Sequence, residues 1–291
     1  MDLKRTLIDL MPGPLVRTFA SPYIAGKGIA SGEAKADALH AQGLSSTIDL
    51  LGEEVEATVQ VYFRMIEALK TRPFATISLK PTQLGIHESV EYCQANLERI
   101  AAMASVHGLR ITLDMEDSSF TDRTLRMFKA VRDRFDNFGI VLQSRLFRTA
   151  DDIRSLHARP CRVRICIGIY QEPAALALQD KPAMKQKLFE YVQLLLEHGH
   201  FPEIASHDEA LVRRCMAHLD QAGVPRDAYE FQMLLGVPRA QLQQEIVRRG
   251  QTVRLYVPFA EAWNHAEHYL KRRLAANPAM AGMVLRNLFG K

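Results

Sequence analysis

The feature that most constrains the fold of this chain is an alternation of short apolar runs with longer amphipathic stretches, beginning near residue 46. The runs are short and mostly apolar, as strands buried on both faces should be. Strands that alternate with helices of this length predict βαβ units and a parallel sheet. The eight expected strands span residues 46–51, 74–80, 109–115, 138–143, 162–168, 201–206, 229–234 and 252–257.

The intervening helical patterns complete the fold prediction. They span residues 53–70, 89–107, 121–135, 184–198, 209–222 and 239–249, and a long last one spans 261–277. Eight strand–helix repeats favour an α/β fold closed into a (β/α)8 TIM-type barrel, for which about 250 residues is the usual size. No G-x-G-x-x-G turn follows a strand, which counts against a Rossmann domain. We expect residues 1–45 to form an N-terminal helical arm packed on the barrel, and residues 46–291 to form the barrel catalytic domain.

Composition excludes several other classes of protein. The chain has 291 residues, and its formal net charge of +4 is spread without a long basic run, so no nucleic-acid footprint is visible. Its four cysteines form no C-x-x-C pair and no zinc-type cluster with histidine, which favours reduced thiols and no metal. No signal peptide and no apolar window of about 20 residues is present. We therefore expect a cytoplasmic protein.

Polar residues close or interrupt most of the expected strands. In a barrel of this type the active site lies at the carboxyl ends of the strands. Each residue alone has an ordinary explanation: Lys80 and Asp114 could form a structural ion pair, and a glutamine could bond loop backbone. Polar groups that converge at one rim predict a site instead. The residues are Glu53 and Glu54, Lys80, Asp114 with Glu116, Gln143, Arg164, His207 with Asp208, Gln232, and Tyr256.

The last helical stretch carries a second candidate site. Tyr269, Arg272, Arg273 and Ala276 share one helix face. Two adjacent arginines beside an aromatic ring can clamp a carboxylate, because each guanidinium can donate a bidentate pair. A basic surface stripe that includes Lys271 is the alternative explanation.

In combination, these motifs resemble the proline dehydrogenase family, in its short monofunctional bacterial form. The resemblance runs in order over nearly the whole chain, and it includes the Tyr269-x-x-Arg272-Arg273 pattern of the last helix. Its other segments are Tyr23–Gly26 (YIAG), Asp49–Glu53 (DLLGE), Ser78–Lys80 (SLK), Leu113–Glu116 (LDME), Ile140–Gln143 (IVLQ), Arg162–Tyr170, Glu230–Gly236 and Val253–Phe259.

The resemblance implies a function and assigns roles to residues. It implies FAD-dependent oxidation of L-proline to 1-pyrroline-5-carboxylate by hydride transfer, as the first step of proline catabolism. A quinone would accept the electrons during transient contact with the membrane surface. The last helix would lie over the carboxyl-end rim of a distorted barrel. Implied catalytic residues are Lys80, Asp114, Tyr256, Tyr269, Arg272 and Arg273, with Lys80, Leu234, Tyr256, Arg272 and Arg273 contacting substrate. Implied FAD contacts are Gln143, Arg164, Cys166, Gly168, Ile169, His207 and Gln232.

Three positions depart from the family pattern and leave alternatives open. Ala276 stands where the family has a glutamate, Ile167 where it has a lysine, and Asp208 where its Thr-His-Asn motif ends in asparagine. One alternative is a flavoenzyme of the same family that acts on hydroxyproline, an N-substituted proline or another cyclic imino acid. Tyr256 disfavours hydroxyproline, because a large residue there crowds a ring hydroxyl. The other alternative is a non-catalytic paralogue that binds flavin or another ligand.

Overall fold

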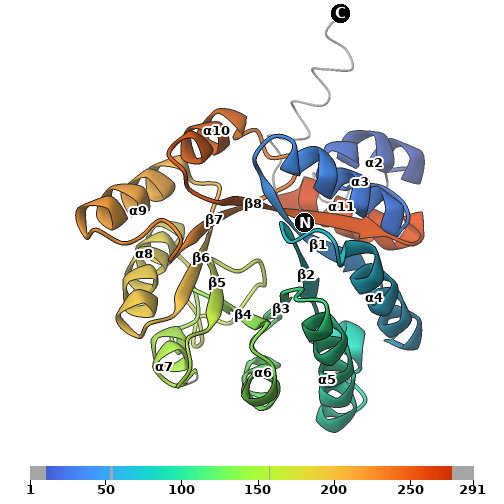
Figure 1. Ribbon diagram of the computed structural model, residues 1–291, viewed down its shortest axis with the longest axis horizontal. Helices are drawn as coiled ribbons and strands as arrows, with labels where there is room; N and C mark the ends of the chain where they lie inside the picture. The colour runs from blue at the N-terminus through green and yellow to red at the C-terminus, as the bar shows by residue number, and fades with distance from the viewer. Residues whose placement is uncertain (1–10, 53–54, 157, 277–291) are drawn as a thin grey trace, which may run out of the picture.

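The computed structural model of the chain describes residues 11–52, 55–156 and 158–276. Eight parallel strands close into a barrel in chain order, and the last strand is hydrogen-bonded to the first (Figure 1). This confirms the predicted (β/α)8 TIM-type fold. The strands are β1 (Ser45–Leu51), β2 (Ala75–Leu79), β3 (Ile111–Leu113), β4 (Phe138–Gln143), β5 (Arg162–Cys166), β6 (Phe201–Ala205), β7 (Glu230–Leu234) and β8 (Val253–Ala260).

A ring of helices surrounds the barrel, and at least one helix follows each strand (Figure 1). Two of them, η2 and α7, were not predicted from the sequence, because four and six residues are too few to display an amphipathic repeat. The helices are α4 (Val55–Leu69), η2 (Pro81–Leu84), α5 (Val90–Val106), α6 (Thr121–Arg134), α7 (Thr149–Arg154), α8 (Lys181–Glu197), α9 (Glu209–Gln221), α10 (Ala240–Arg248) and α11 (Trp263–Ala276).

Within the described residues, three further helical segments precede β1: α2 (Gly13–Ala20), η1 (Ser21–Tyr23) and α3 (Ile29–His40). A small apolar cluster joins α2 and η1 to α11 and to the carboxyl ends of β1 and β8; its buried members are Val16, Tyr23, Ile24, Leu51, Ala260, Ala266 and Leu270. Arg17 of α2 also pairs with Glu267 of α11 at 2.7 Å. The last helix is thereby held near the carboxyl-end rim. The division into an arm of residues 1–45 and a catalytic domain stays a prediction.

The barrel has an apolar outer layer and a polar interior. Side chains such as Ile77, Leu79 and Phe138 are at most 2% exposed within the large apolar core. The interior of most barrels of this type is filled by Val, Ile and Leu. Here a connected set of buried or partly buried polar side chains, which we call the interior network, occupies that space. Its members are Arg162, Arg164, Glu203, Glu230, Gln232 and Arg254.

The described residues hold neither a membrane-spanning helix nor a cluster of metal ligands. None of their helices is long and apolar enough to cross a lipid bilayer. No group of three or more His, Cys, Asp or Glu side chains in the described ranges is placed to hold a metal ion. Cys93, Cys161 and Cys215 are buried free thiols, and burial raises the pKa of each.

Candidate active site

Side chains from four strands meet at the carboxyl end of the barrel. Lys80, directly after β2, forms an ion pair with Asp49 of β1 and lies 3.4 Å from Asp114 Oδ2. Its Nζ donates to the Tyr256 hydroxyl of β8 at 3.2 Å. That hydroxyl in turn donates to Asp114 Oδ2 at 2.8 Å. The structure therefore brings the sequence-predicted Lys80, Asp114 and Tyr256 into one hydrogen-bonded cluster.

Asp49 is the member of this cluster that sequence reasoning did not select. It lies in the middle of the β1 run Ser45–Leu51 and is only 1% exposed. A carboxylate inside a strand that is buried on both faces requires a charged partner, because an isolated buried charge is very costly. This need for a charged partner could have marked Asp49 as a candidate from the sequence, and Lys80 is that partner.

The charges of this cluster are held in place by their neighbours. Burial opposes the charge of Lys80, but Asp49, Tyr256 and Asp114 outweigh it and raise the Lys80 pKa well above its usual value. Burial likewise opposes ionisation of Asp114, yet Lys80 and Arg164 lower its pKa. Burial and the two carboxylates raise the pKa of Tyr256. At neutral pH the cluster thus presents an ammonium, an ionised Asp114 and a neutral phenol.

Arg164 of β5 connects this cluster to the interior network. Its Nη1 donates to Asp114 Oδ1 at 2.8 Å, and its Nε donates to Gln232 Oε1 at 2.6 Å. The guanidinium also lies 5.1 Å from the ring centroid of Tyr256. Gln232 Nε2 donates to Glu203 and Glu230, at 2.8 and 2.7 Å. Both ends of the Gln232 amide therefore have protein partners, and its connection to the rim runs through Arg164.

The buried polar atoms near the rim that lack a partner among the described residues include Arg164 Nη2, a donor, and Gln143 Oε1, an acceptor. Gly168 lies against Gln143, since a Cβ at Gly168 would be 2.0 Å from that oxygen, and its φ of +96° also favours glycine. Ile169 follows with 70% of its surface exposed. A donor, an acceptor and an exposed apolar side chain suit a flat heteroaromatic ligand such as a flavin, whose ring edge both donates and accepts hydrogen bonds.

The remaining predicted cofactor residues have clear local roles. The His207 ring accepts a hydrogen bond from the Leu234 backbone N–H at 3.2 Å. His207 follows β6, and this bond places its ring beside the carboxyl end of β7. Asp208 caps α9 by accepting from Leu211 N at 2.9 Å, and its ion pair with Lys185 lowers its pKa. Burial raises the pKa of the Cys166 thiol to about 11, so the thiol stays protonated.

The carboxylate clamp is only partly described. Tyr269 of α11 is partly buried against the small apolar cluster. Arg272 and Arg273 lie on the last turns of α11, but their side chains fall outside the described part of the structure. Glu53 and Glu54 also lie outside the described residues. The predicted clamp of Arg272 and Arg273 stays a prediction.

Comparison with known proteins identifies the family. A family model described as proline dehydrogenase matches residues 33–169 and 176–286. The chain belongs to the proline dehydrogenase family. Proline dehydrogenase 1 of Bacillus subtilis (strain 168) is 31% identical over 298 residues, covering 100% of this chain and 97% of that protein. Proline dehydrogenase of Deinococcus radiodurans is 32% identical over 297 residues, covering 98% and 94%. The protein is therefore an oxidoreductase of a flavin-dependent family.

Solved structures agree on the fold. Proline utilization A from Bdellovibrio bacteriovorus, inactivated by N-propargylglycine, superposes with a TM-score of 0.81 at 23% identity. The superposition covers 89% of this chain but only 32% of that longer one, so this chain spans about a third of its length. At this identity the likeness supports the barrel alone, whereas the resemblance to proline dehydrogenases seen in the sequence is confirmed by the family match.

Proposed function

We propose that this protein is an FAD-dependent proline dehydrogenase that oxidises L-proline to 1-pyrroline-5-carboxylate, the first step of proline catabolism. Membership of the proline dehydrogenase family supports proline oxidation. The observation that carries the proposal is the cluster of Lys80, Asp114 and Tyr256 at the carboxyl end of the barrel, where enzymes of this fold have their active sites.

FAD is the cofactor that this rim suits. We assign Gln143 and Arg164 to the flavin ring because each has a buried polar atom without a partner among the described residues. Gly168 lies directly against Gln143, and Cys166, Ile169 and His207 complete the contact surface. Gln232 positions Arg164. When bound, FAD supplies an acceptor for the hydride that leaves the ring carbon next to nitrogen. The Arg164 charge favours negative charge on that acceptor.

The protein contributes charge balance and positioning. Lys80 pairs with Asp49 and Arg164 pairs with Asp114, so the polar groups of the cluster have partners within the protein. Arg272 and Arg273 would bind the substrate carboxylate, and Leu234, Tyr256 and Tyr269 would contact its ring. Because Tyr256 donates to Asp114 and accepts from Lys80, its ring is held in one orientation. This positioning and the exclusion of water would supply much of the catalysis.

The sequence favours one alternative substrate class. Ala276 is a small, uncharged residue at the end of α11, where the family pattern has a glutamate. The imino nitrogen therefore has one anionic partner fewer, which is compatible with an N-substituted proline. In either case we propose that a quinone takes the electrons, that the protein is cytoplasmic, and that it contacts the membrane surface transiently.

Anaerobic reduction of the bound flavin tests this proposal. The purified protein should be yellow, and L-proline should bleach its flavin absorbance, whereas N-methylproline and hydroxyproline should act much more weakly. Bleaching by N-methylproline but not by L-proline would support the alternative substrate class. A protein that neither contains FAD nor binds added FAD would be the non-catalytic paralogue, and both enzymatic assignments would be wrong.

A further inference from the structure

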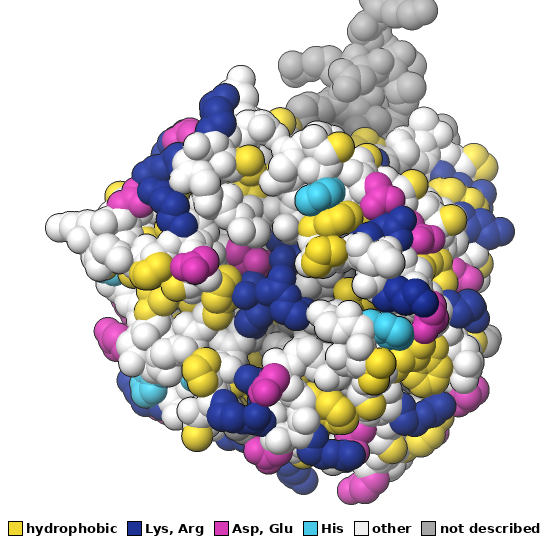
Figure 2. All heavy atoms as spheres, viewed as in Figure 1, with side chains coloured by type: hydrophobic (Ala, Val, Ile, Leu, Met, Phe, Trp, Pro, Cys, Tyr) yellow, Lys and Arg dark blue, Asp and Glu magenta, His cyan; other side chains and the backbone are white. Residues whose placement is uncertain are grey.

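Basic side chains also gather at the end of the barrel opposite the candidate active site. On the face shown in Figure 2, Lys and Arg side chains lie together over the centre of the barrel. A pocket at the amino ends of β2 to β6 is lined by Thr76, Arg110, Thr112, Arg162 and Glu203, with five further residues behind them. None of the basic side chains in this pocket is used in the proposed oxidation.

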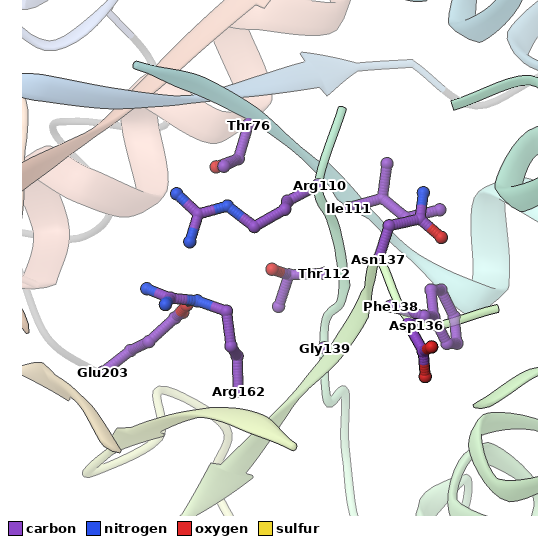
Figure 3. Close-up of a pocket in the computed structure, with 10 residues that line it drawn as sticks. All are labelled: Thr76, Arg110, Ile111, Thr112, Asp136, Asn137, Phe138, Gly139, Arg162 and Glu203. Atoms are coloured by element: carbon purple, nitrogen blue, oxygen red, sulfur yellow. The ribbon is translucent and has the colours of Figure 1, made fainter. Parts of the chain in front are cut away.

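Two guanidinium groups of this pocket point to the same space. Figure 3 shows Arg110, just before β3, and Arg162, the first residue of β5, both directed toward the barrel axis, with the side chain of Thr112 between them. Asp136 and Asn137 extend to the other side of the pocket (Figure 3). The enclosed space between the lining residues is small, about 20 Å³, and it opens to solvent, so only a small ion would fit.

The charges around this space do not balance. Arg162 donates to Glu203 at 2.8 Å and to Glu230 at 2.7 Å. Arg254 donates to Glu230 at 2.6 Å. The Arg110 guanidinium forms no hydrogen bond or ion pair with any side chain in the described ranges. Three guanidinium groups thus face two carboxylates, which leaves one uncompensated positive charge.

The surroundings of Arg110 make this charge unfavourable. Burial, together with the like charges of Arg162 and Arg254, lowers the Arg110 pKa to about 10, although Glu230 and Glu203 oppose the shift. A partly buried cation without a partner loses hydration that nothing replaces. An anion in the pocket would replace the lost hydration of Arg110. It would pair with the Arg162 guanidinium at the same time.

We propose that the amino-end mouth of the barrel binds one small oxyanion, of the phosphate or carboxylate type, between Arg110 and Arg162. Guanidinium groups recognise planar or tetrahedral oxyanions through paired N–H donors, which a spherical halide cannot match as well. The Thr112 hydroxyl can donate a further hydrogen bond. Because the anion completes the charge balance of the interior network, its binding stabilises the folded barrel and is separate from substrate binding.

Isothermal titration and thermal unfolding of the full-length protein test the site, with phosphate or acetate added to a chloride buffer of constant ionic strength. We expect one phosphate or acetate ion to bind and chloride to compete poorly. At ten times its Kd the anion should raise the Tm by about 3 °C. Arg110→Met should weaken binding at least about tenfold, whereas Arg126→Met, which removes an exposed arginine from α6, should not. Comparison of phosphate with acetate identifies the preferred type of anion.

Several results would overturn the proposal. If neither phosphate nor acetate binds native protein more tightly than chloride, the site does not exist as described. If Arg110→Met retains native affinity, the anion binds elsewhere, for example at the predicted substrate clamp. If phosphate raises the Tm of native protein, Arg110→Met and Arg126→Met equally, the effect is general salt stabilisation. Circular dichroism of Arg110→Met confirms that a loss of binding does not reflect unfolding.

Discussion

Replacing Glu230 by glutamine should destabilise the barrel strongly and in a pH-dependent manner. Glu230 is 2% exposed and accepts hydrogen bonds from Arg162 and Arg254. Burial opposes its ionisation, but the two arginines outweigh burial and lower its pKa from 4.5 to about 2. At about 1.4 kcal/mol per pKa unit, ionised Glu230 contributes about 3 kcal/mol to stability at pH 7. Glu230→Gln should lose about this amount.

The pH dependence separates this account from a simple loss of packing. Because the folded pKa of Glu230 lies below the unfolded value, its contribution is complete above about pH 4.5 and declines as pH falls toward 2. Urea unfolding should therefore give a difference between native protein and Glu230→Gln of about 3 kcal/mol at pH 7 and about 2 kcal/mol near pH 3.5. Glu245→Gln, which breaks an exposed ion pair with Arg213, is the matched control and should change little. A difference that is the same at both pH values would refute the electrostatic explanation.

Three further changes test the candidate active site. Tyr256→Phe should lower kcat/KM about tenfold to hundredfold, because it removes the hydroxyl between Lys80 and Asp114; unchanged steady-state kinetics would exclude that role. Gly168→Ala should weaken FAD retention at least about tenfold, because the added Cβ meets Gln143; full flavin content by absorbance after dialysis would contradict this. Arg272→Met should raise the KM for L-proline about tenfold or more, with Lys271→Met as the control on the same helix, and an unaltered KM would remove Arg272 from the clamp.

The barrel could be predicted from sequence because each strand overlaps a separate apolar run. Every one of the eight expected runs overlaps one strand, although the ends of the runs and the strands differ. β3 keeps only Ile111–Leu113, while β8 extends to Ala260 because β1 pairs with it along its whole length. The ends of a strand depend on how far its neighbours continue, and a single run does not contain that information.

The polar side chains were harder to assign than the strands. Lys80, Asp114 and Tyr256 were selected because they end or interrupt apolar runs, yet their mutual contacts depend on closure of the barrel. Asp49 was missed because its run is otherwise apolar and its partner, Lys80, is 31 residues away. The assignment of Gln232 to the flavin stays a prediction, and its amide binds side chains of β5 and β6 that the sequence did not indicate. Sequence spacing can identify candidate polar residues. Their hydrogen-bond partners, however, depend on which strands lie together in the closed barrel.

The interior network also affects how stability changes with temperature. Exposure of apolar surface raises the heat capacity on unfolding, whereas exposure of polar surface lowers it. Because Arg164, Glu203, Glu230 and Arg254 occupy the barrel interior, that region contributes little to the heat-capacity increment, which arises mainly from the apolar layer between strands and helices. The cost of desolvating such ions also falls as temperature rises. The curve of unfolding free energy against temperature should therefore be flatter for this barrel than for a barrel with an aliphatic interior. On warming, the interior network should lose less of its contribution to the free energy of unfolding.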